Sequence, residues 1–110
     1  MEQLGPQQKI FIDLVLQFLA KLNIFEEISV VYDEKTHGYR FFAVPQILFK
    51  DIVKDIPKEN YNKVGLATDV PDESSIVDES VLYEKVFYCC SDLIWGYITG
   101  GREIVESEAN

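Results

Sequence analysis

The stretch that decides the fold is IVDESVLYEKVFYCCSDLIWGYIT, residues 76–99. Its composition favours strands, because β-branched and aromatic residues are frequent in it. Its periodicity favours a helix, because at about 100° per residue the polar side chains gather in one arc and the apolar ones in another. The polar arc holds Ser80, Glu84, Lys85, Ser91, Asp92 and Thr99, and the apolar arc holds Leu82, Tyr83, Val86, Phe87, Cys89, Cys90, Leu93, Ile94 and Tyr97. We therefore predict one long helix whose apolar arc is buried.

A hairpin that turns at Ser91 and Asp92 is the rival interpretation of this stretch. It is disfavoured because neither alternation class of the two strands separates polar from apolar side chains. We expect the helix to begin near Ser75, where Ser75 and Asp78 fit the looser form of a capping box, and to continue to Gly100.

A second helix is predicted at the start of the chain, from Pro6 to about Leu22. Proline suits the first helical position, apolar residues recur at helical spacing, and Asn23 can end the helix in a left-handed conformation. Ile12 and Leu16 make the apolar side wider than one packed face requires. This helix is therefore expected to be central or to form a dimer interface.

Between these helices the pattern changes to that of strands. Apolar residues alternate over 28–32 and gather over 39–44, and a polar loop with His37 and Gly38 separates the two runs, which predicts a β-hairpin. A hairpin alone is marginal in water, so we expect it to pack on the helices or to gain a third strand from Lys63–Thr68.

A further helix is predicted to open at Pro45 and to stop at Pro57, followed by an acidic, turn-rich loop over 58–75. The resulting prediction is a single α+β domain over residues 1–110, with a short acidic tail at 102–110. Its order is helix, β-hairpin, helix, acidic loop and long C-terminal helix. The length suits one hydrophobic core.

The charge of the chain is strongly acidic and uneven. The formal net charge is −9, and residues 61–110 hold ten acidic and three basic residues, against nine and seven in residues 1–60. Such a field repels nucleic acid and anionic lipid and attracts basic proteins. No stretch has the length and apolarity of a membrane helix, so we expect neither direct nucleic-acid binding nor membrane binding.

Chemistry-bearing residues are few. The two cysteines, Cys89 and Cys90, are adjacent, which disfavours a disulfide and favours a reducing, cytoplasmic setting. The single histidine, His37, falls in the predicted hairpin loop, and a dyad with Cys90 is disfavoured by burial of the thiol. No metal-ligand spacing and no phosphate-binding glycine loop occurs. We predict no catalytic residue, no metal and no cofactor, and so no enzyme.

The candidate partner-binding surface combines carboxylates with aromatic side chains. Asp69, Asp72, Glu73, Asp78 and Glu79 form an acidic run without a basic residue, and the helical projection places Tyr88 and Trp95 in the polar arc. Large aromatics on a polar face are typical of interfaces. The expected contact residues are Asp69, Asp72, Glu73, Asp78, Glu79, Glu84, Tyr88, Asp92 and Trp95.

Size and charge favour a non-enzymatic protein-binding module. By analogy with small acidic immunity proteins, we expect an inhibitor that occludes a basic, nucleic-acid-acting partner such as a nuclease toxin. One alternative is a regulatory or assembly subunit that forms a homodimer through residues 6–22. A second alternative is a DNA mimic that blocks a DNA-binding protein.

Overall fold

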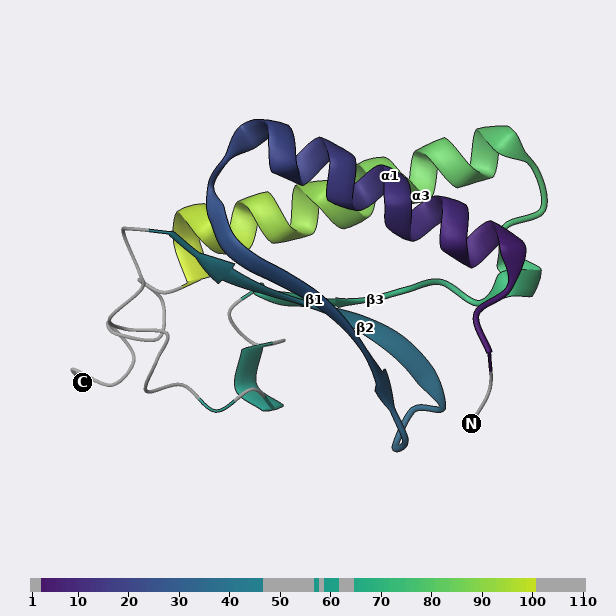
Figure 1. The fold of residues 1–110 in the computed structure, drawn as a ribbon, viewed down its shortest axis with the longest axis horizontal. Coiled ribbons are helices and arrows are strands. Elements are labelled where there is room, and N and C mark those ends of the chain that lie inside the picture. Colours follow the sequence, from purple (N-terminus) through teal and green to yellow (C-terminus); the bar gives the residue numbers. More distant parts are fainter. Residues whose placement is uncertain (1–2, 47–56, 58, 62–64, 101–110) are drawn as a thin grey trace.

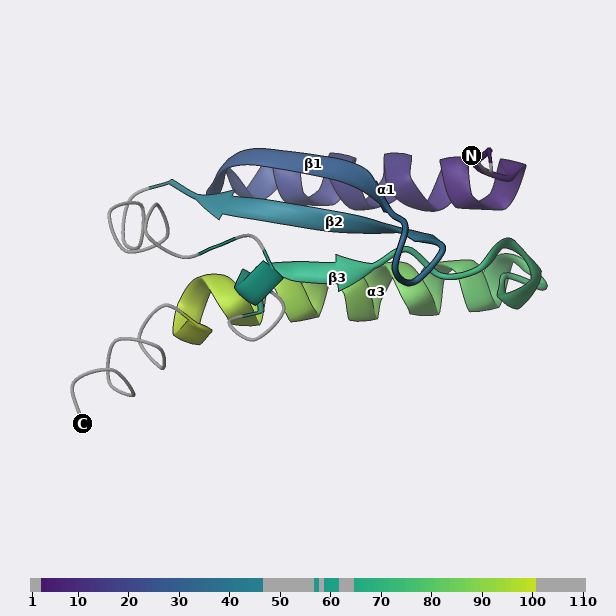
Figure 2. The same ribbon diagram turned by 90° about the horizontal axis from the view of Figure 1, so that it is seen from below.

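Two long helices cover one face of a three-stranded antiparallel sheet in the computed structural model of the protein (Figure 1, Figure 2). The structure describes residues 3–46, 57, 59–61 and 65–100. In chain order the elements are α1 (Pro6–Leu22), β1 (Phe25–Asp33), β2 (Gly38–Pro45), β3 (Ala67–Asp69), a 3-10 turn η2 (Glu73–Ser75), α3 (Glu79–Trp95) and a π-helical turn η3 (Gly96–Gly100). The predicted α+β fold is confirmed.

The first helix forms as its sequence predicts. Pro6 occupies the first turn, and Asn23 ends α1 in the left-handed conformation at φ 54°. The buried face of α1 consists of Phe11, Ile12, Val15 and Leu19. The apolar side is indeed wider than this face, because Phe18 and Leu22 are about half exposed.

The decisive stretch is helical, so the hairpin interpretation of residues 76–99 is wrong. The predicted start was too early, however: Ser75 belongs to η2, and the cap of α3 is Asp78, whose carboxylate accepts a hydrogen bond from the Val81 N–H at 2.9 Å. The buried face of α3 consists of Leu82, Val86, Cys89, Cys90 and Leu93. Tyr83 and Phe87, which we expected in the buried arc, are 51% and 67% exposed.

The predicted hairpin is β1 and β2, paired in register from Ile28 opposite Ala43 to Asp33 opposite Gly38. The turn depends on His37, which adopts a left-handed conformation at φ 56°. Pro45, expected to open a helix, instead ends β2 opposite Phe25. The remainder of that expected helix, 47–56, lies outside the described residues, as does the tail 102–110.

The third strand exists but lies slightly later than predicted. Instead of Lys63–Thr68 it is β3, which pairs with β2 from Ala67 opposite Phe42 to Asp69 opposite Arg40. The acidic loop therefore contains both β3 and η2.

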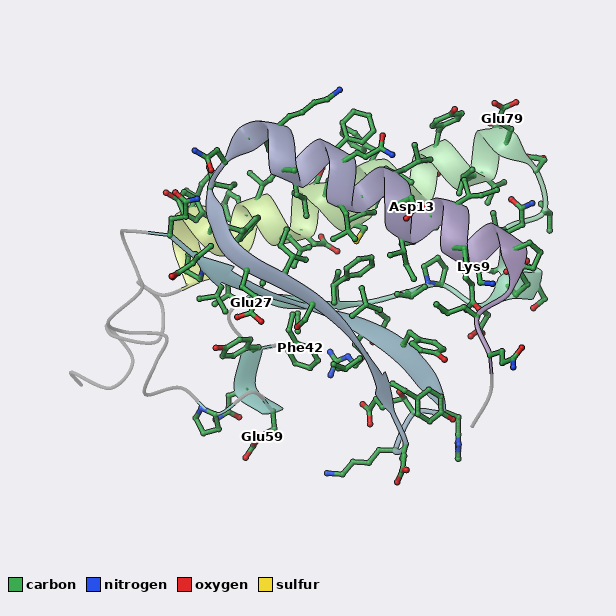
Figure 3. All side chains as sticks on the ribbon, in the orientation of Figure 1. Lys9, Asp13, Glu27, Phe42, Glu59 and Glu79 are labelled. Atoms are coloured by element: carbon green, nitrogen blue, oxygen red, sulfur yellow. The ribbon has the colours of Figure 1, made fainter. Side chains whose placement is uncertain are left out.

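The helix-facing side of the sheet packs directly on α1, where the rings of Phe11 and Phe41 lie 6.0 Å apart. On the opposite face Tyr61 packs against Phe42 at 6.0 Å, and Figure 3 shows Glu27 and Phe42 on this side of the sheet. Aromatic contacts thus hold the sheet on both faces: Phe41 packs on α1 on one face, and Phe42 packs on Tyr61 on the other.

The end of α3 is held against the loop before β3 by two glycines. Gly65 adopts φ 72°, and a Cβ on Gly96 would overlap the backbone of Gly65. Only glycine allows this approach, and it brings the end of α3 against the loop before β3.

Candidate protein-binding surfaces

The acidic residues expected to meet a partner divide into two groups in the structure. Asp69, Glu73 and Asp78 accept hydrogen bonds from other residues of the chain, although Asp69 and Asp78 are exposed as well. Asp72, Glu79, Glu84 and Asp92 are exposed, and Figure 3 shows Glu79 at the start of α3.

Glu73 completes the start of a helix far from it in sequence. Its two carboxylate oxygens accept hydrogen bonds from the backbone N–H groups of Gln7 and Gln8, each at 2.9 Å. The first N–H groups of a helix have no partner within the helix, and the Gly5 cap offers no side chain. The negative charge also suits the positive end of the α1 dipole. Glu73 is therefore a structural residue.

Asp69 and Asp78 are engaged more locally. Asp69 accepts a hydrogen bond from the Arg40 guanidinium at 2.8 Å, in an ion pair across β2 and β3. The same guanidinium lies 5.7 Å from the ring centroid of Phe42. Asp78 caps α3, as described above. Both carboxylates are exposed all the same, and of the two only Asp69 has its charge offset by an ion pair.

The exposed residues form a line along α3 that we call the acidic flank: Glu84, Tyr88, Asp92 and Trp95. Their spacing of three or four residues places them on one face of the helix. Tyr88 is 59% and Trp95 62% exposed, as the helical projection predicts. A shallow cavity of about 250 Å³ lies beside Tyr88 and Asp92, and the end of β3 at Asp69 lines its other side.

A second surface was not among the predicted site residues. Between α1 and α3 lies an open cavity of about 350 Å³ that we call the apolar groove. It is lined by Phe18, Leu19, Lys21 and Leu22 of α1 and by Tyr83, Val86, Phe87, Cys90 and Ile94 of α3. Among the described lining residues one is charged, Lys21, and its ammonium lies 5.9 Å from the ring centroid of Phe18.

Sequence reasoning could have indicated the α1 side of this groove but not the α3 side. The excess apolar width of residues 6–22 indicated an additional contact. Phe87 gave no such signal, because apolar residues at its position in the arc are usually covered by a neighbouring element. In the structure the centre of the apolar arc of α3 is buried, whereas Phe87 at the edge of that arc is exposed.

Both thiols are free and buried. Burial raises the pKa of the Cys89 thiol well above its ordinary range, with smaller contributions from Cys90 and Asp92, and burial likewise raises the pKa of Cys90. A raised pKa leaves little thiolate, which is the reactive form. Cys90 lines the apolar groove, whereas His37 lines a separate cavity near the start of α1, so the two do not share a site.

Within the described part of the chain, no group of three or more histidine, cysteine, aspartate or glutamate side chains is arranged to hold a metal ion. In the same residues no helix has the length and apolarity to cross a membrane. Comparisons with protein-family models, with curated proteins and with solved structures found no match.

Proposed function

We propose that this protein is a non-enzymatic protein-binding module whose acidic flank receives a basic protein partner. The proposal rests on one observation. Tyr88 and Trp95 are 59% and 62% exposed, and they lie in one line along α3 with the exposed carboxylates of Glu84 and Asp92. Exposed aromatics beside charged groups have the composition of an interface with an anchoring centre and a polar rim.

In this proposal charge and aromatic surface have separate tasks. The excess of ten acidic over three basic residues in 61–110 attracts a cationic surface from a distance and speeds encounter. Trp95 then buries its indole in the partner and slows dissociation. A partner that acts on nucleic acid presents cationic groups for its substrate, and carboxylates paired with those groups would block substrate entry. This is the mode of action of an acidic inhibitor of the immunity type.

Because the carboxylates of Asp69, Glu73 and Asp78 already have hydrogen-bond partners within the chain, we centre the proposed contact on the acidic flank, with the exposed Asp72 and Glu79 as further contact residues. A DNA mimic is a variant of this proposal, but it needs a longer row of exposed carboxylates. The acidic flank has two carboxylates and two aromatic side chains, and this favours a small contact anchored by an aromatic residue over a DNA mimic. The free, buried thiols support a reducing compartment such as the cytoplasm.

The first experiment is capture from a lysate of the source cell with four tagged baits: wild type, Trp95→Ala, the double variant Glu84→Gln/Asp92→Asn, and Phe87→Ala. We expect wild type and Phe87→Ala to retain the same basic protein, released by raised salt, and the other two baits to retain less of it. Phe87→Ala is a matched control because it removes an equally exposed aromatic that lines the apolar groove and does not belong to the acidic flank.

Binding kinetics with the purified partner then separate the two tasks. The double variant should lower the association rate and its dependence on salt, whereas Trp95→Ala should raise the dissociation rate by on the order of 30-fold, from about 2 kcal/mol of lost contact. Wild-type kinetics in both variants would rule out the acidic flank as the binding surface.

A further inference from the structure

The outer face of the helix layer carries several apolar side chains that are about half exposed. On α1, Ile10, Phe18 and Leu22 are 44%, 50% and 49% exposed. On α3, Tyr83 and Phe87 are 51% and 67% exposed. These side chains extend and border the apolar groove, and together they present about 500 Å² of exposed side-chain surface, taking roughly 150–250 Å² for each whole side chain.

This area matches what a stable dimer needs. A continuous apolar patch of about 300–600 Å² is as large as any on a typical monomer and is often functional. A standard interface buries about 800 Å² on each partner, of which somewhat more than half is non-polar. The uncovered surface therefore supplies the apolar part of one side of such an interface, and the polar residues around it supply the rim.

The charge distribution makes a second copy an acceptable occupant. The chain has a formal net charge of −9, so most pairings of two copies would oppose like charges. The described lining of the groove contains no carboxylate and one ammonium, that of Lys21. Tyr88 and Asp92 of the acidic flank line the separate cavity beside β3, and none of the four flank residues is among the described residues that line the groove. Two copies can thus meet groove to groove without placing a carboxylate of the described groove lining in the contact.

We propose that the apolar groove is the interface between two copies of this chain. Ile10, Leu14, Phe18 and Leu22 recur every four residues along α1, a stripe about 18 Å long at 1.5 Å per residue. A stripe of that length fits a helix better than a small ligand, because helices pack their side-chain ridges into each other's grooves. In the dimer the two helix layers form the centre, and a sheet lies on each outer side.

The test is the mass of the protein in solution, measured by sedimentation from low to high micromolar concentration. Wild type should be a dimer that dissociates on dilution. Phe87→Glu places a charge in the groove of each copy and should raise the dissociation constant by at least about 100-fold, since an unpaired charge in an apolar contact is strongly unfavourable. Leu22→Glu makes the same test from α1, where Leu22 is 49% exposed.

Tyr88→Glu is the matched control, because Tyr88 is the next residue along α3 and is 59% exposed but lies outside the groove. It should dimerise like wild type. A wild type that is monomeric throughout, or folded Phe87→Glu and Leu22→Glu variants that dimerise normally, would overturn the proposal. So would a Tyr88→Glu variant that loses the dimer equally. Because the acidic flank is tested by Trp95→Ala, failure of one proposal is distinguishable from failure of the other.

Discussion

The two sides of α3 both expose aromatic side chains, but they do so among different neighbours. Phe87 borders the apolar groove next to α1, whereas Tyr88 lies beside Asp92 and the end of β3. The two rings touch, with centroids 5.7 Å apart, although their positions on the helix differ by about 100°. Exposure alone therefore does not define a binding surface. The charges around an exposed aromatic decide whether it suits an apolar copy of the chain or a cationic partner.

If Phe87 and Tyr88 both belong to the surface of α3, replacing either should affect stability far less than replacing a residue on the buried face of the same helix. Leu93 is fully buried between the two sides, so Leu93→Ala should lower the free energy of unfolding by about 2–5 kcal/mol. Phe87→Ala and Tyr88→Ala should each change it by less than about 0.5 kcal/mol. Urea denaturation at a concentration where the protein is monomeric measures all three. A loss for Phe87→Ala as large as that for Leu93→Ala would make the groove side part of the core.

The second prediction sharpens the acidic side of the comparison by separating structural from available carboxylates. Glu73→Ala removes two charge-assisted hydrogen bonds to the start of α1 and should cost about 1.5–3 kcal/mol of unfolding free energy. Asp72→Ala is the control, because the Asp72 side chain is exposed and makes no cap hydrogen bond, and its cost should stay below about 0.5 kcal/mol. Equal costs would mean that the capping contact contributes nothing.

The success of the sequence in predicting α1, the hairpin and α3 follows from local causes. Pro6 and Asn23 define the ends of α1 through their own backbone preferences, and the periodicity of 76–99 outweighed its strand-like composition. Local sequence patterns did not predict contacts between segments that lie far apart in the chain. The carboxylate of Glu73 caps a helix that begins 67 residues earlier in the chain, at Pro6, and nothing in the sequence around residue 73 indicates this.

The candidate surfaces divide in the same way. The exposure of Tyr88 and Trp95 followed from the helical projection, because polar residues such as Glu84, Ser91 and Asp92 share their arc. The exposure of Tyr83 and Phe87 did not, because a projection gives the direction of a side chain but not how far the neighbouring helix extends over it. The width of the apolar side of α1 was the remaining sign that the two helices do not fully cover each other.

The smallest predicted effect concerns the buried thiol between the two sides of α3. Burial raises the pKa of Cys89, so the folded protein keeps this proton at a pH where the unfolded chain, with a thiol pKa of about 8.5, has lost it. The contribution is therefore complete below about pH 8.5 and is lost as the pH rises further. Between about pH 8 and pH 9.5, below the usual range of tyrosine, Cys89 should account for a loss of about 1 kcal/mol of unfolding free energy. Cys89→Ala should remove that part of the pH dependence, as followed by urea denaturation at each pH. Cys90→Ala, at the edge of the groove, should retain the part of the pH dependence that Cys89 contributes. A Cys89→Ala variant with the wild-type pH dependence would show that the packing of α3 on the sheet does not protect the Cys89 thiol.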